Sequence, residues 1–455
     1  CFKKALAINP KYLEAHYSIA LIFQEFEQLE EMISHLEAVI KIQPDLSKAH
    51  NRIGDALQQL GQLNEAIEYY QKAIKFNSKF SEAHNNLGNV YKNIGQFDDA
   101  VNSYKKALEI NPDYPALHNN LGSAYRDLNQ LDNAEKSYKK ALEYNPDFPD
   151  TLNNLGIVLF EKGDINKAVK SFKKAIAIRS DYDEAYNNLG RVFLSLNELN
   201  EAVENYELAL KINPNNLKTY DNLASAYLQF GQTDDAIRYY KKSIEINPNF
   251  SYVHNNLGNV FKQIGTFDEA FKCYEKAIKL NPNFAEGYNN LGATFKELNQ
   301  FEKAKNSFER AIELNSDFAI AYNNLGNLHK DFDNLDDALD SYERAFDIEN
   351  SLDNVLGNLL STKMNCCNWD GLADLLVDAK KRIVNNERVV EPFTLLGLID
   401  DSAIQRKATE LRVNSNHPKS NILPAIDQYP KHPIIRIGYF SADFREHPLA
   451  YLTAE

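Results

Sequence analysis

Hydrophobic and small residues recur along this chain with a period of 34 positions. Within residues 81–94 the apolar and small positions are spaced i, i+3, i+4 and i+7, which is one face of a helix. These positions are His84, Leu87, Gly88 and Tyr91. Residues 98–110 repeat the pattern, and the segment GQF at 95–97 predicts a turn between two helices.

Two columns of residues keep this register over most of the chain. A small residue recurs at Ala20, Gly54, Gly88, Gly122, Gly156, Gly190, Ala224, Gly258, Gly292 and Gly326. An aromatic residue recurs at Tyr70, Tyr104, Tyr138, Phe172, Tyr206, Tyr240, Tyr274, Phe308 and Tyr342. One helix pair cannot bury its apolar face alone, so a period of this length indicates stacked repeats. The chain resembles the tetratricopeptide repeat (TPR) proteins over residues 1–365, and we predict an all-α TPR superhelix of about ten helix pairs.

A pair of asparagines precedes the small residue in most repeats. The second asparagine is the more regular, and it occupies Asn86, Asn120, Asn154, Asn188, Asn222, Asn256, Asn290, Asn324 and Asn358. An amide both donates and accepts hydrogen bonds, so stacked repeats would form a ladder that can hold a peptide backbone. The resemblance implies that this stripe lies in the concave groove, and we predict that these nine residues bind substrate proteins. The alternative is that an asparagine bonds locally to the neighbouring repeat, and for the first asparagine of each pair we favour such a structural role or a neutral one.

Composition excludes several classes of protein. The net charge of −14 argues against nucleic acid as the main partner, since a phosphate backbone requires a basic surface. The acidity is compatible with solubility alone and with recruitment of basic partners, and both interpretations stay open. No apolar run has the length of a membrane span. The cysteines, at positions 1, 273, 366 and 367, lack disulfide or zinc spacing, so we expect reduced thiols in a cytoplasmic protein with no metal site.

The repeat pattern fades after residue 350. We predict a TPR array over residues 1–365 and a helical linker region over 366–433, with a helix at 400–413. Trp369, the only tryptophan, is expected in a core. The run of apolar, β-branched and aromatic residues at 434–440 predicts a buried strand, and Pro448 after His447 predicts a helix start. Residues 434–455 are therefore predicted as the truncated start of an α/β domain.

The order of these parts carries a second resemblance. A long TPR array, CNWD at 367–370, PFTLL at 392–396 and RIGYFSADFREHP at 436–448 resemble the O-linked N-acetylglucosamine transferases and SPINDLY-like proteins. The resemblance implies a glycosyltransferase domain of the GT-B type after the array. It also implies that His447 is a catalytic residue close to the sugar nucleotide.

Function follows from this resemblance as an expectation. The groove would recruit protein substrates, and the catalytic domain would transfer GlcNAc from UDP-GlcNAc, the donor, to Ser or Thr. No other cofactor is expected, and residues 1–455 alone are predicted to be inactive. The alternatives are a SPINDLY-like O-fucosyltransferase that uses GDP-fucose and a non-enzymatic TPR adaptor or scaffold.

Overall fold

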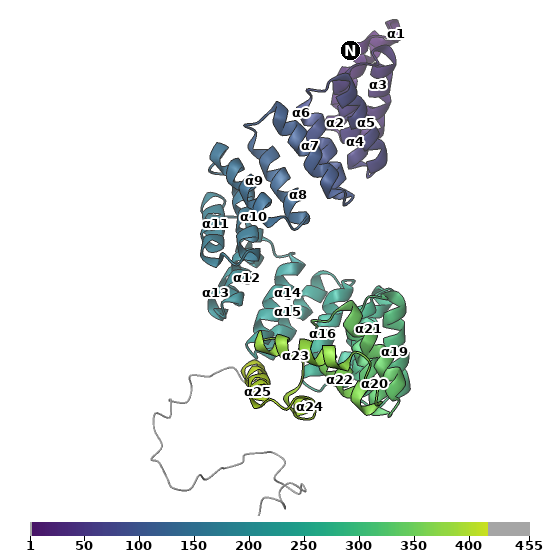
Figure 1. Cartoon of the computed structure of the whole chain (residues 1–455). Coiled ribbons are helices and arrows are strands. Elements are labelled where there is room, and N and C mark those ends of the chain that lie inside the picture. Colours follow the sequence, from purple (N-terminus) through teal and green to yellow (C-terminus); the bar gives the residue numbers. More distant parts are fainter. Residues whose placement is uncertain (1, 417–455) are drawn as a thin grey trace, which may run out of the picture. The chain divides into compact units, whose positions relative to one another are not determined.

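The computed structural model describes residues 2–416, and every regular element in this part of the chain is a helix (Figure 1). Helices α2 to α21 form pairs, in which the even-numbered helix comes first. The first helices are α2 (Leu13–Glu25), α4 (Ser47–Gln59), α6 (Ser81–Asn93), α8 (Pro115–Asp127), α10 (Pro149–Glu161), α12 (Asp183–Ser195), α14 (Leu217–Gln229), α16 (Ser251–Gln263), α18 (Ala285–Glu297) and α20 (Ala319–Asp331). The second helices are α3 (Leu29–Ile42), α5 (Leu63–Phe76), α7 (Phe97–Ile110), α9 (Leu131–Tyr144), α11 (Ile165–Ile178), α13 (Leu199–Ile212), α15 (Thr233–Ile246), α17 (Phe267–Leu280), α19 (Phe301–Leu314) and α21 (Leu335–Ile348). The remaining helices are α1 (Phe2–Ile8), α22 (Val355–Asn365), α23 (Leu372–Val384), α24 (Pro392–Leu396) and α25 (Ser402–Asn416).

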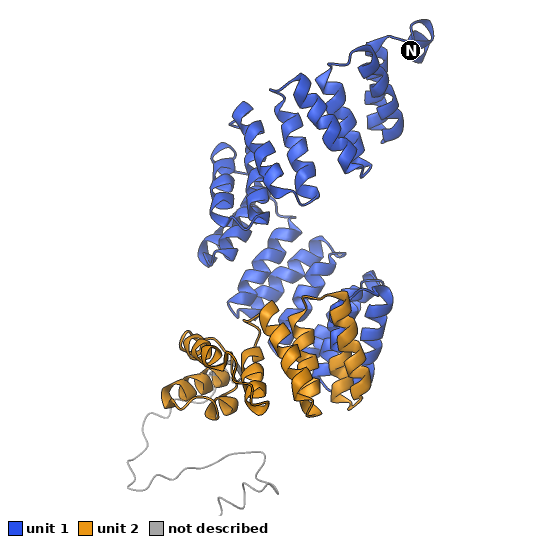
Figure 2. Ribbon diagram, turned by 45° about the vertical axis from the view of Figure 1, so that its right-hand side comes forward, with its two compact units in different colours: residues 1–290 blue, residues 291–455 orange. Residues whose placement is uncertain are grey.

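The chain divides into two compact units, residues 1–290 and residues 291–455 (Figure 2). Within the first unit each helix packs on the next one along the chain, as α4 does on α5 and α5 on α6. The first helices α4, α6, α8, α10, α12 and α14 also contact one another in succession. No two second helices in the described part of the chain touch to that extent. The first helices therefore form one continuous surface of unit 1, which we call the first-helix face.

The turn inside each pair requires a left-handed backbone. Five such turns use glycine, at Gly61, Gly95, Gly163, Gly231 and Gly265, all with φ between 73° and 81°. Where glycine is missing, the turn position holds Asn129, Asn197, Asn299 or Asp333, and Glu27 in the first pair, also with positive φ. Asparagine and aspartate tolerate this conformation better than other residues with a side chain. The predicted turn at 95–97 is confirmed, since Gly95 has φ 78° and α7 begins at Phe97.

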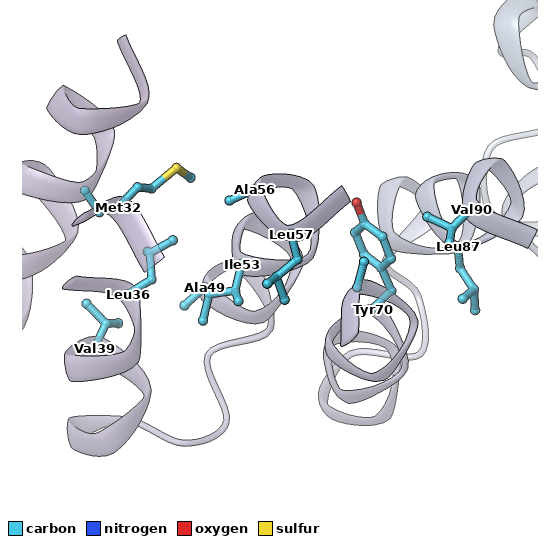
Figure 3. Packing of buried hydrophobic residues seen from close by; sticks show 12 residues of the cluster. Met32, Leu36, Val39, Ala49, Ile53, Ala56, Leu57, Tyr70, Leu87 and Val90 are labelled. Atoms are coloured by element: carbon cyan, nitrogen blue, oxygen red, sulfur yellow. The ribbon is translucent and has the colours of Figure 1, made fainter. Parts of the chain in front are cut away.

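The core of nine of the ten pairs is an aromatic ring from the second helix, packed on the small residue of the first helix. All nine aromatic side chains are at most 2% exposed. At Gly156 an added Cβ would lie 2.7 Å from Cε1 of Phe172, which is closer than real contacts allow. Figure 3 shows the same layering near the N-terminus, where Leu36 of α3, Ile53 of α4, Tyr70 of α5 and Leu87 of α6 belong to one buried cluster.

The hydroxyl groups of several core tyrosines donate to the first helix of their own repeat, whereas the buried hydroxyls of Tyr138 and Tyr206 have no hydrogen-bond partner among the described residues. Four of these tyrosines donate to the residue 15 positions earlier: Tyr70 to Asp55 at 2.8 Å, Tyr104 to Asn89 at 2.7 Å, Tyr274 to Asn259 at 2.7 Å and Tyr342 to Asn327 at 2.8 Å. Where that earlier residue is Ile157 or Ala293, the aromatic residue is Phe172 or Phe308, which has no hydroxyl. A buried hydroxyl without a partner is destabilising, so phenylalanine suits these two repeats.

The predicted fold class needs one correction. An all-helical array was expected and is present, but the start of an α/β domain was also predicted, and that part of the fold class is wrong. Residues 2–416 contain helices and no strand. A short β-branched and aromatic run does not by itself distinguish a strand from other buried segments, and this made the prediction weak. The segment on which it rested, 434–455, lies outside the described residues.

The part after residue 350 is helical as far as it is described. The helix predicted at 400–413 is confirmed as α25. Trp369 is 63% exposed, so the expectation that it lies in a core is wrong. A cluster that includes Leu356, Leu360, Ile383 and Leu395 forms the core here instead. The predicted domain boundary at 365/366 marks where the repeats end, and it differs from the boundary between the two compact units. It stays a prediction.

The contact between Gly156 and Phe172 predicts a coupled mutational effect. Gly156→Ala should destabilise the protein by about 1–3 kcal/mol despite alanine's better helix propensity, because the methyl group meets a buried ring. Phe172→Leu in the same chain should relieve the clash, since Ala20 and Leu36 form the corresponding pair in the first repeat. Urea unfolding of the two single variants and the double variant measures the coupling. Destabilisations that simply add would contradict the proposed contact.

Candidate protein-binding surface

The two asparagine columns bond to each other across neighbouring repeats. In each case the side-chain N–H of the second asparagine donates to the side-chain oxygen of the first asparagine of the preceding repeat, 35 residues earlier. The bonds join Asn120 to Asn85 at 3.0 Å, Asn154 to Asn119 at 3.1 Å, Asn188 to Asn153 at 3.0 Å, Asn222 to Asn187 at 2.9 Å, Asn290 to Asn255 at 3.0 Å and Asn358 to Asn323 at 3.1 Å. We call these bonds the amide ladder.

A carboxylate is the acceptor at two steps of the amide ladder: Asp221 replaces the first asparagine, whereas Asp55 lies 31 residues before its donor and Asn51 stands at the usual acceptor position. Asn86 donates to Asp55 at 2.8 Å, and Asn256 donates to Asp221 at 2.7 Å. Arg52 stands where the next asparagine would be toward the N-terminus. Its guanidinium donates to Tyr17 at 3.0 Å and to Gln24 at 2.7 Å, both on α2. The ladder therefore begins at Asn86 and changes its chemistry before it.

The first asparagines are mostly buried, and their role is structural. Asn153 is 1% exposed, Asn187 3% and Asn255 0%. At Asn119 the side-chain oxygen accepts from Asn154 and also from the hydroxyl of Thr151, both at 3.1 Å. A side chain this buried cannot reach a bound protein. Sequence analysis favoured a structural or neutral role for this column, and the structure supplies the partner that the sequence alone did not identify.

Some of the second asparagines keep hydrogen-bonding capacity beyond the amide ladder, whereas Asn188 is only 4% exposed and is as buried as the first asparagines. Asn120, Asn154 and Asn222 are only partly buried. A primary amide has two N–H donors and an oxygen with two lone pairs. The ladder uses N–H groups of these residues, and their oxygens accept no hydrogen bond from the described residues. These carbonyl oxygens are available on the first-helix face of unit 1.

Acidic residues stand four positions before some of the second asparagines, at Glu82, Asp150, Glu184 and Glu286, and most of them bond to other residues of the array. Glu82 accepts from Asn51 at 3.4 Å, and Glu286 accepts from Asn255 at 3.1 Å. Asp150 forms an ion pair with Arg179 at 2.8 Å. Glu184 is exposed and forms no ion pair. Most of these carboxylates therefore bond to neighbouring residues of the array and are not available to a bound protein.

Asp55 is the most perturbed carboxyl group on this surface. Its burial disfavours the charged form and raises its pKa from 3.8 to about 6, although hydrogen bonds from Tyr70 and Asn86 act in the opposite direction. Burial also raises the pKa of Asp221, again against a hydrogen bond from its ladder asparagine. Sequence analysis did not single out either residue. The spacing of 15 to the core tyrosine and 31 or 35 to the ladder asparagine is the signal that could have found them.

The larger clefts of the first unit lie beside the second helices, away from the amide ladder. One of about 860 Å³ is lined by Tyr125 of α8 and by Glu135 and Lys139 of α9. Its walls mix acidic and basic side chains without a converging set of donors. Across residues 2–416 no group of three potential metal ligands comes together. His447, the predicted catalytic residue, lies outside the described residues.

One further negative finding concerns the membrane. Within residues 2–416 no helix combines the length and apolar character that a membrane span would need. This agrees with the absence of long apolar runs in the sequence.

These features define a class of protein: an array of stacked helix pairs with a repeated polar surface along its first helices. Models of the TPR repeat match residues 54–95, 88–125, 122–163, 224–265 and 258–299. Other models of the tetratricopeptide repeat match residues 13–46, 147–215, 205–238, 285–318 and 318–349. Together the matches span 13–46 and 54–349, and the chain belongs to the tetratricopeptide repeat family. Arrays of this family typically bind protein partners.

Solved structures give similar folds, whereas no curated protein matches this chain. Two structures of MamA are 29% and 30% identical, cover 37% and 36% of this chain and 92% and 95% of their own, and have TM-scores of 0.33. Yeast Tom70 is 17% identical, covers 90% of this chain and 98% of its own, and has a TM-score of 0.48. These overall superpositions are too loose to add to the family assignment. None of the matches points to a glycosyltransferase.

The raised pKa of Asp55 predicts a pH-dependent stability. A carboxyl group that binds its proton more tightly in the folded chain stabilises the fold at low pH, and this contribution is lost as the pH rises from about 4 to about 6. Asp55→Asn keeps an acceptor for Tyr70, as Asn89 does for Tyr104. The variant should match the parent near pH 4 and exceed it by about 2–3 kcal/mol at pH 7.

Chemical unfolding at several pH values checks this prediction. Glu68→Gln, at a side chain that is 70% exposed, is the control and should change stability equally at each pH. A stability difference between Asp55→Asn and the parent that stays constant with pH would show that Asp55 is not the group responsible.

Proposed function

We propose that this chain is a protein-binding TPR array, an adaptor that holds extended protein segments along its first-helix face. The observation that carries the proposal is the amide ladder with its available carbonyl oxygens. A peptide backbone presents one N–H and one C=O per residue, and an asparagine side chain can pair with either. Recognition of this kind depends on an extended backbone more than on side chains, which suits a protein with several partners.

Repeat spacing fits an extended segment. Packed helices lie about 8–10 Å apart, and an extended chain rises about 3.3 Å per residue. A ladder amide would therefore meet a backbone group at about every third residue. The contacts between successive first helices from α4 to α14 make this spacing continuous through most of unit 1.

The ladder asparagines have a second role, which changes the expected effect of their substitution. From the sequence alone, alanine at these positions should keep or improve stability. The structure shows that Asn222→Ala would leave the buried oxygen of Asn187 without its donor. An unpaired buried acceptor costs about 1–3 kcal/mol, so we now expect a loss of stability.

A matched pair of variants separates binding from stability. Asn187→Ala removes the hydrogen bond but leaves the Asn222 amide on the surface, because Asn187 itself is 3% exposed. Asn222→Ala removes both the bond and the surface amide. Both variants should lower the melting temperature, and only Asn222→Ala should weaken binding of extended peptides selected from a display library, by about threefold to tenfold. Fluorescence anisotropy measures the affinities below the melting temperatures. Equal affinities in the two variants would contradict contact between Asn222 and the peptide.

A second candidate function rests on the sequence motifs at 367–370, 392–396 and 436–448. They support the proposal that the array recruits substrates for transfer of GlcNAc from UDP-GlcNAc, or of fucose from GDP-fucose, with His447 as the catalytic residue. Residues 1–455 alone should transfer neither sugar to a peptide selected by the array. The protein isolated from its source should transfer one of the two labelled sugars. Absence of transfer by that protein, with peptide binding retained, would favour the adaptor.

The proposed compartment is the cytoplasm. The described cysteines Cys273, Cys366 and Cys367 are all free, which fits a reducing environment. Burial raises the pKa of Cys273 to about 11, so this thiol is a poor nucleophile near neutral pH.

A further inference from the structure

Arginines on the first helices differ from most other arginines of the described chain, among which Arg344 alone also lacks an ion pair. Elsewhere, guanidinium groups pair with carboxylates at Arg179, Arg238, Arg310, Arg382, Arg388, Arg406 and Arg412. Three arginines belong to first helices: Arg52 on α4, Arg126 on α8 and Arg191 on α12. None of the three forms an ion pair within the described residues. The chain has 64 acidic residues, so carboxylates are not scarce. The three arginines lack ion pairs because of where they lie on the surface.

Arg191 is the most available of the three. Its side chain is exposed, and its guanidinium lies 6.0 Å from the centre of the Phe160 ring on the preceding first helix. The corresponding position in other repeats is Asn89, Ser123 or Ile157, so the positive charge is not a general feature of the repeat. An aromatic ring beneath a guanidinium restricts its movement and leaves its N–H edge open.

Arg52 shows the same arrangement four helix pairs earlier. It lies 5.9 Å from the centre of the Tyr17 ring on the preceding first helix. Hydrogen bonds to Tyr17 and Gln24 use Nε and Nη1, while a guanidinium has five N–H donors in all. The carboxyl group of Asp55 interacts electrostatically with Arg52, but its oxygens already accept hydrogen bonds from Tyr70 and Asn86. The carboxylates at Glu82, Asp150 and Glu286 are likewise engaged by other residues.

We propose that unit 1 selects extended protein segments that carry Asp or Glu side chains, with Arg191 as the principal carboxylate-binding residue. This inference rests on the proposed function, because it names the kind of segment that the first-helix face prefers. Arginine binds carboxylates through two parallel N–H···O bonds, a geometry that the ring-supported guanidinium can offer. Arg126 and Arg52 bind further carboxylates of the same segment.

The arginines occupy alternate first helices, α4, α8 and α12, which sets a spacing for the partner. Two steps between packed first helices span about 16–20 Å, or about five to six residues of extended chain. The segment that fits best therefore carries acidic side chains at intervals of about six residues. The ladder amides between them hold its backbone. Nucleic acid remains excluded as the main partner by the charge of −14.

Three synthetic peptides test this inference with the chain as it exists. Each is a fluorescein-labelled Ser/Thr-rich peptide of about 20 residues, with Glu, Gln or Lys at every sixth position to match the arginine spacing. The Glu peptide should bind about tenfold more tightly than the Gln peptide, and the Lys peptide more weakly than either. Arg191→Gln should reduce affinity for the Glu peptide by about threefold to fivefold, as expected for a partly exposed ion pair, and should leave the Gln peptide unchanged.

Arg344→Gln on α21 is the matched control. Arg344 is also exposed and forms no ion pair, but it belongs to a second helix, so its substitution should change neither affinity. Equal binding of the Glu and Gln peptides would overturn the inference and leave the proposed function standing. An equal loss of Glu-peptide affinity in Arg191→Gln and Arg344→Gln would also overturn it, since overall charge would then explain the effect. Failure of all three peptides to bind would count against the inference and the proposed function together.

Discussion

The close contact between a glycine and an aromatic ring is the constraint on which the repeat depends. Where the ring of Phe172 lies against Gly156, no Cβ can be accommodated, so the two helices of the pair pack at one distance. In Tyr104, Tyr274 and Tyr342, which occupy the same place in other repeats, the hydroxyl donates to the first helix 15 residues earlier. The apolar packing and the polar surface are thus set by one residue pair per repeat.

The same register makes the amide ladder possible. Because each pair has the same geometry, the two asparagines of adjacent repeats meet at 2.9–3.1 Å over many steps. In the bond between Asn222 and Asn187, the accepting amide is buried, and the donor is partly buried and retains a carbonyl oxygen. A binding surface built in this way is also part of the interface between repeats, so its side chains are oriented before any partner arrives. Such preorganisation lowers the entropy cost of binding.

Much of the fold follows from the sequence because its period is regular. The 34-residue spacing, the small and aromatic columns and the turn at 95–97 sufficed to predict helix pairs. The pairing of the asparagine columns was not predicted, since a bond between residues 35 apart depends on how neighbouring repeats are rotated. Trp369 was assigned to a core by residue type, but α22 and α23 bury leucine and isoleucine instead. The strand predicted beyond residue 433 rested on a short pattern without periodicity, whereas the helices rested on many repeats.

The bonds of the amide ladder join only adjacent repeats, and this affects how such a chain can change in evolution. Every rung joins neighbours, so duplication or loss of one whole repeat would reconnect the remaining asparagines without a mismatched rung. The backbone-holding surface would simply lengthen or shorten. The arginines of α4, α8 and α12 would behave differently, because an extra repeat between two of them changes the interval at which they stand. Gene rearrangement in units of 34 residues could therefore preserve the capacity to hold a chain while altering which acidic sequence matches it.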